Sequence, residues 1–164
     1  MIDCKQSPFN SALETGVRTL TILTASFPTA HDLSRLVQYD YLTVHSADAG
    51  GPPSIHPPLP FRSGEILVRR GLIESGLHLM ISRALVSREF HANGFLYKAE
   101  ESAEVFLGNM QSNYILELRN RAYWVADTFD TVGTDKLNSI IDDLFETWTI
   151  EFQPIQLSSR EGRF

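Results

Sequence analysis

The residues best suited to chemistry in this sequence are two histidines and an aspartate beside a proline-rich segment. His45, Asp48 and His56 supply ring nitrogens and a carboxylate, and a catalytic zinc site needs only three such protein ligands. One function that they suggest is therefore a metal-dependent hydrolase. They lack the fixed spacing along one helix that defines a motif such as HExxH. We therefore favour a structural role, in which these side chains cap and cross-link the loop through hydrogen bonds.

Other catalytic signatures are missing from the sequence. It contains no GxxxxGK[ST], GxGxxG or GxSxG pattern, and Gly50-Gly51 is followed by prolines, which lack the N–H groups that cradle a phosphate. Cys4 has no neighbouring group that would activate its thiol. We expect no catalytic residue, no bound metal and no cofactor.

Several charged residues are interpreted as structural ion pairs. Glu65 and Arg69 are spaced i,i+4 with the acid first, which is the favourable order on a helix. Arg70 falls on the apolar side of the same helix, where an unpaired charge is costly, so we expect it to pair with a buried acid such as Asp40. Asp40, His45 and His56 are expected to make internal hydrogen bonds.

The long helix that carries these arginines is predicted to run from about Ser63 to Leu85 and to lead directly into a β-hairpin. Asn93-Gly94 marks the turn, because both residues tolerate the positive φ of a tight hairpin. Two earlier helices are predicted from apolar residues at helical spacing, the first capped by Ser11 with Glu14 and the second by Thr29. The predicted fold class is mainly α with a small β-hairpin wing: a winged-helix-like domain with a C-terminal helical extension.

The predicted domain organisation follows from this order of elements. Residues 7–110 form the winged-helix-like core, 111–150 form the helical extension packed on it, and 151–164 form a tail. Five of the chain's prolines lie within the core in a loop at 46–62, where they rule out a helix or a central strand. A loop of this length in a compact domain is usually functional or disordered. We expect this one to be ordered and packed on the core.

The C-terminal part is predicted to carry a protein interface. Apolar residues of the last helix recur at helical spacing, and then Trp148, Ile150 and Phe152 alternate with polar residues as in a strand that Pro154 ends. A lone strand leaves its edge open, so this one should pair either internally, with the wing or a strand near the N-terminus, or by addition to a partner such as the ATPase, which we favour. The candidate interface residues are Leu144, Phe145, Trp148, Ile150 and Phe152.

Composition limits the possible partners. The 164 residues include one cysteine and carry a net charge of −6, and no apolar run is long enough to span a bilayer. We expect a cytoplasmic protein with no membrane contact. DNA binding usually needs a basic surplus, so only Arg88 and Lys98 on the wing are candidates for a backbone-phosphate contact. The polar face of the long helix is neutral to acidic and consists of Glu74, Ser75, His78 and Ser82, which argues against a winged-helix transcriptional regulator reading the major groove.

Four stretches together resemble a known family: FNSALETGVR at 9–18, YDYLTVHSADAGGPPSIHPPLP at 39–60, RSGEILVRRGLIESGLHLM at 62–80, and GFLYKAEESAEVFL in and after the hairpin. They resemble the middle component of prokaryotic ABC-three-component systems, which include Lamassu-type anti-phage defence. The resemblance spans roughly residues 9–130, and its most specific part is His45–Arg70.

The resemblance implies a non-catalytic adaptor. In such systems an SMC-like ABC ATPase senses or holds DNA, an effector such as a nuclease does the damage, and the middle subunit joins them. DNA would then be contacted only indirectly or weakly, through the complex. The transcriptional regulator and the metal-dependent hydrolase remain the alternatives.

Overall fold

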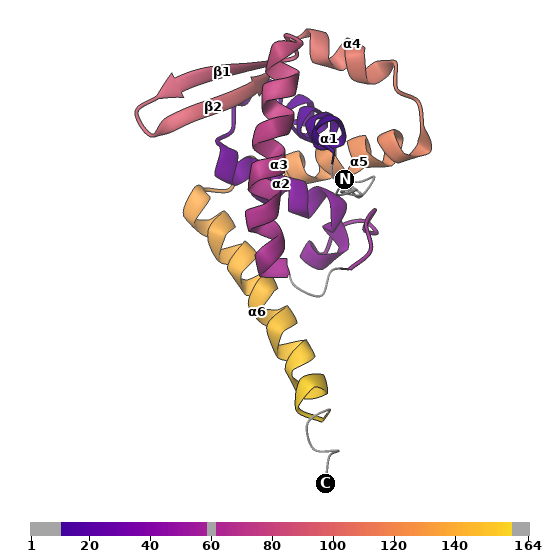
Figure 1. Cartoon of the computed structure of the whole chain (residues 1–164), viewed down its shortest axis with the longest axis vertical. Coiled ribbons are helices and arrows are strands. Elements are labelled where there is room, and N and C mark those ends of the chain that lie inside the picture. The colour runs from indigo at the N-terminus through magenta and orange to yellow at the C-terminus, as the bar shows by residue number, and fades with distance from the viewer. Residues whose placement is uncertain (1–10, 59–61, 159–164) are drawn as a thin grey trace, which may run out of the picture. The chain divides into compact units, whose positions relative to one another are not determined.

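The computed structural model describes residues 11–58 and 62–158, with side chains at 11–58 and 66–146 (Figure 1). The chain divides into two compact units, Met1–Thr131 and Val132–Phe164. The described part is mostly helical with one two-stranded antiparallel hairpin, so the predicted fold class, a mainly α chain with a small β wing, is confirmed. None of the helices in this part is long and apolar enough to cross a membrane.

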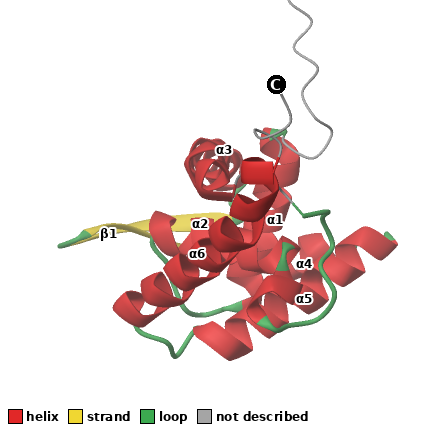
Figure 2. Ribbon diagram, turned by 90° about the horizontal axis from the view of Figure 1, so that it is seen from below, coloured by secondary structure: helices red, strands yellow, loops and turns green. Residues whose placement is uncertain are grey.

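The first unit contains all elements except the last helix. In chain order they are α1 (Ala12–Ala25), α2 (Leu33–Val44), a 3-10 turn η1 (Ser46–Ala49), α3 (Arg62–Ser82), β1 (Val86–His91), β2 (Gly94–Ala99), α4 (Ser102–Gly108) and α5 (Asn113–Phe129). The hairpin extends away from the packed helices, as Figures 1 and 2 both show.

Helix α1 lies at the centre of the first unit, in contact with α2, α3, α4, α5 and β2. Its residues from Thr15 to Leu23 are all buried. Burying hydroxyl groups is costly unless they are hydrogen-bonded. The hydroxyls of Thr19 and Thr21 donate back to the carbonyls of Thr15 and Val17, at 2.8 and 2.7 Å. The Thr19 and Thr21 hydroxyls are therefore satisfied within the core, whereas the buried Thr15 hydroxyl has no hydrogen-bond partner among the described residues.

The helix caps agree with the sequence at one site and differ at another. Ser11 Oγ accepts a hydrogen bond from the Glu14 amide at 3.1 Å, as the capping-box spacing predicts. The predicted cap of α2 was Thr29, but the structure has Asp32 there, whose Oδ1 accepts from the Arg35 amide at 2.8 Å. An aspartate is as good an N-cap as a threonine, so both residues fit the pattern.

The hairpin pairs Val86 with Ala99 and His91 with Gly94, which makes Ala92 and Asn93 the two turn residues. Of the predicted pair Asn93-Gly94, only Gly94 has a positive φ, at 120°. The turn signal thus marked the place of the hairpin, although the two turn residues lie one position earlier, at Ala92 and Asn93. A single bridge, His31 with Tyr97, adds a further pairing to the β2 side of the hairpin.

The second unit is described by itself, as one helix α6 (Thr134–Ser158). The predicted strand at Trp148, Ile150 and Phe152 was wrong, because these positions are helical, and the helix continues through Pro154. Positions 141, 144, 148 and 152 are spaced by three or four residues, which also fits a helix. Three alternating residues are too short a pattern to outweigh that spacing.

Candidate interaction site

A buried charge cluster joins three helices at the base of the proline-rich loop. Asp40 on α2 is fully buried and accepts from Arg18 on α1, with Nε to Oδ1 at 2.9 Å and Nη2 to Oδ2 at 3.3 Å. Arg69 on α3 donates from Nη1 to Oδ2 of the same carboxylate, the oxygen that also accepts from Arg18 Nη2. Burial alone would raise the pKa of Asp40, but the two guanidinium groups outweigh it and lower that pKa to about 2. The carboxylate is therefore ionised and holds α1, α2 and α3 together.

The pairing differs from the one predicted for the arginines. Arg69, not Arg70, reaches Asp40, while Arg70 is exposed and donates to Ser34 Oγ at 3.4 Å. Adjacent helix residues differ by 100° in direction, so a small error in the assumed buried face exchanges their roles. The Glu65 side chain, the predicted partner of Arg69, lies outside the described residues.

The loop after α2 packs against α5. The Nε2 atom of His56 and the Tyr114 hydroxyl are hydrogen-bonded at 2.9 Å, and their rings stack. Arg121 Nε donates to the Pro53 carbonyl at 2.9 Å. Gly51 lies so close to Trp124 that a Cβ placed there would be 2.5 Å from the indole ring. These contacts hold residues 51–56 against one face of α5.

The loop also folds back onto its own stem. The amides of Ile55 and His56 both donate to the Val44 carbonyl, at 3.0 and 3.1 Å. Asp48 Oδ2 accepts from the Tyr41 hydroxyl at 2.6 Å. Burial and the nearby Arg18 and Arg69 lower the pKa of His56 to about 4, so its imidazole is neutral at pH 7.

The structure thus shows how the three candidate metal ligands lie. His45 is buried at the end of α2, its ring centroid is 6.3 Å from that of His56, and the Asp48 carboxylate faces Tyr41. Over residues 11–58 and 62–158, no group of three or more His, Cys, Asp or Glu side chains is arranged to hold a metal ion. The observed contacts of Asp48 and His56 are hydrogen bonds to tyrosines.

One face of the hairpin exposes two aromatic side chains and an arginine. Phe90 and Phe95 pair directly across the strands with their ring centroids 5.3 Å apart, and they expose 75% and 44% of their surface. Arg88 lies on the same face, with its guanidinium carbon 4.4 Å from the centre of the Phe95 ring. We call these three residues the wing face. A projecting aromatic pair flanked by a cation is suited to docking in an apolar pocket of another protein.

The wing's two candidate phosphate contacts are separated. Arg88 pairs with Tyr97 while Lys98 pairs with Ser87, so the two cations point to opposite faces of the hairpin. Lys98 Nζ also lies 3.9 Å from Glu89 Oε1. The hairpin therefore presents no joint basic patch made of Arg88 and Lys98.

Sequence reasoning missed other exposed apolar residues. Leu67 and Val68 near the start of α3 expose 76% and 62% of their surface. Phe90 and Phe95 could have been found from the sequence, because they flank the turn symmetrically and so face the same way. Their exposure depends on how far the hairpin projects, which local patterns do not show.

Comparisons with known proteins identify one family. Residues 8–151 match the sequence profile of the ABC-three component (ABC-3C) system Middle Component 2. No curated protein and no solved structure gave a significant match.

Proposed function

Because this chain belongs to the Middle Component 2 family of ABC-3C systems, we propose that it is a non-catalytic adaptor subunit. In this proposal it joins an SMC-like ABC ATPase to an effector such as a nuclease, within a cytoplasmic anti-phage complex of the Lamassu type. DNA is contacted only through the complex.

The observation that carries the proposal is the wing face. Phe90 exposes 75% of its surface at the end of a projecting hairpin, where desolvating it gains free energy only if another molecule covers it. Aromatic residues and arginine are the side chains that most often anchor protein interfaces. The Phe90–Phe95 pair and the stacked Arg88 combine both in one patch.

The order of elements supports a winged-helix body for the adaptor. The order of elements is that of winged-helix domains: helix α1, the His31 bridge, α2, α3 and then the hairpin. This is an argument from fold alone, and a winged helix can serve either DNA or protein recognition. The separation of Arg88 and Lys98 favours protein.

Helix α6 supplies a second proposed contact. We expect its interface positions, Leu144, Phe145, Trp148, Ile150 and Phe152, to act as a helix laid into a partner's groove rather than as an added strand. Two separate contacts are what a subunit needs to hold two other proteins.

The experiment is co-purification with the ATPase and effector encoded in the same system. We expect Phe90→Ser combined with Phe95→Ser to abolish retention of at least one of them. Leu116→Ser is the matched control, because Leu116 on α5 is also exposed and lies away from the wing. Retention of both partners by the wing variant at wild-type levels would show that the wing face is not an interface.

A further inference from the structure

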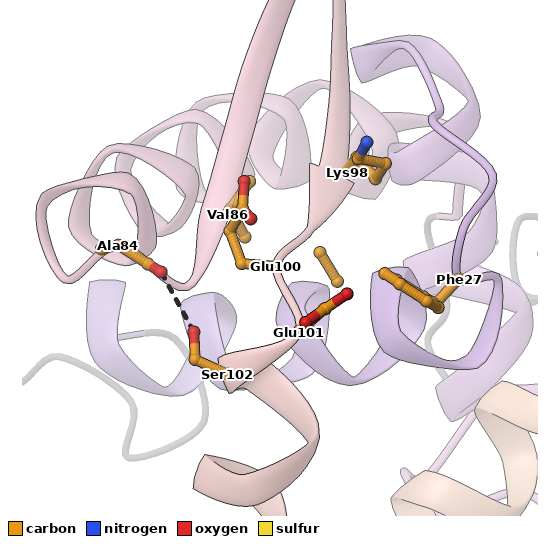
Figure 3. A pocket seen from close by; sticks show the side chains of 8 residues that line it. Phe27, Ala84, Val86, Lys98, Glu100, Glu101 and Ser102 are labelled. Carbon is orange, nitrogen blue, oxygen red and sulfur yellow. Dashed lines mark hydrogen bonds between the residues drawn. The ribbon is translucent and has the colours of Figure 1, made fainter.

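A groove lies at the foot of the hairpin, where α1, the end of α3 and the start of α4 meet. Two adjoining cavities of about 540 and 380 Å³ share Phe27, Glu100 and Glu101 in their lining. Figure 3 shows the Phe27 ring on one side of it, Val86 and Lys98 on the hairpin, and Glu101 between them. The shared residues make the two cavities one continuous groove.

The aromatic side of this groove is held in place. Phe27 exposes 46% of its surface on the turn after α1. Its amide donates to the Thr24 carbonyl at 3.2 Å, and the Thr29 amide donates to the Ser26 carbonyl at 2.8 Å. The Ser26 hydroxyl is in turn bonded to Asp130 at 3.2 Å. These bonds fix the backbone that carries the ring, so little backbone entropy is lost there when a ligand covers Phe27.

The charge beside the ring is negative. Within the described residues, neither Glu100 nor Glu101 takes part in an ion pair, whereas the cation of the lining, Lys98, is 3.9 Å from Glu89. The third acid of the groove, Glu104, holds Arg119. The free carboxylates of Glu100 and Glu101 thus leave the groove acidic.

We propose that this groove binds a basic segment of a partner subunit, with an apolar side chain over Phe27 and a flanking lysine or arginine at Glu100 and Glu101. The proposal rests on the adaptor function, for which it supplies a docking site apart from the wing face. Charge complementarity selects this occupant, because the carboxylates repel phosphate and acidic peptides alike.

The test is a photo-crosslink in the assembled complex. Ser102 lines the groove and is exposed, so p-benzoylphenylalanine is placed there, and at Glu117 on α5 as a control. We expect the Ser102 probe to form an adduct with a partner peptide that contains lysine or arginine beside an apolar residue, and the Glu117 probe to give no such adduct.

Two kinds of variant test the chemistry. Two variants should remove the adduct and weaken binding of the partner by tenfold or more in an interferometry titration. The first is Phe27→Ser, and the second combines Glu100→Lys with Glu101→Lys. Asp127→Lys, an exposed charge reversal on α5, should leave both unchanged. Melting curves verify that each variant is folded, which is expected for the charge reversals because neither the Glu100 nor the Glu101 side chain makes a hydrogen bond or ion pair with the described residues.

Other results overturn the proposal. An adduct with a second copy of this chain, with nucleic acid or with an acidic segment would show a different occupant. An intact complex without a Ser102 adduct would leave the adaptor function standing and refute the groove as a docking site. Failure of the ATPase and effector to co-purify at all would refute the adaptor function, and this proposal with it.

Discussion

Helices α1 and α3 cross at two glycines, Gly16 and Gly76, and this close contact gives a sharp test of the fold. A Cβ added at Gly76 would lie 2.6 Å from the Gly16 amide nitrogen and 2.8 Å from its Cα. These are backbone atoms that cannot rotate away. We therefore predict that Gly76→Ala forces the two helices apart.

The size of the effect follows from two opposing contributions. Overpacking costs about 1–3 kcal/mol, and the upper end applies to a backbone clash. Replacing a helical glycine with alanine stabilises the fold by about 1 kcal/mol, because alanine has the higher helix propensity. The net loss of about 2 kcal/mol should lower Tm by roughly 4–8 °C in a chain of this size.

Gly71 provides the matched control on the same helix. It is exposed, and a Cβ placed there would meet nothing within 4 Å. Gly71→Ala should therefore raise Tm by about 1–4 °C through propensity alone. Thermal unfolding followed by circular dichroism measures both variants. A Gly76→Ala protein as stable as the wild type would refute the packing described for α1 and α3.

Two further predictions concern the charge cluster and the loop. Asp40→Asn should destabilise the fold by about 3–5 kcal/mol, because Arg18 and Arg69 then remain buried without a carboxylate. Urea denaturation measures the free energy of unfolding, and a loss below about 1 kcal/mol would contradict this prediction. The pKa of His56 is lowered to about 4 in the folded chain, whereas an unfolded histidine has a pKa of about 6.5, so the unfolded chain binds a proton at this site more readily than the folded chain. Protonation of His56 should therefore reduce the stability of the fold as pH falls from about 6.5 to 4. Replacing His56 with Gln should flatten Tm against pH in that window, and an unchanged slope would show that another group is responsible.

The sequence predicted those elements whose signals are local. Ser11 and Glu14 marked the start of α1, and the turn residues before Phe95 indicated a hairpin. These features depend on hydrogen bonds between residues close in the chain, so spacing alone reveals them.

Features that depend on distant residues were missed or misassigned. Asp40 and Arg69 are 29 positions apart in the sequence. To predict that Arg69 and not Arg70 pairs with Asp40, one must know how α3 is rotated about its axis relative to α2. The Gly16–Gly76 contact is likewise invisible without the crossing of two helices. The groove around Phe27 gathers residues from the end of α1 and the start of α4, and no local pattern joins them.

The central claim is that this chain physically joins the ATPase to the effector. The direct measurement is retention of the effector by an immobilised, tagged ATPase, with and without this chain. The adaptor function predicts that the effector is retained only when the chain is present, and at an equimolar amount or a fixed ratio to it. Equal retention of the effector in the absence of the chain would contradict the claim.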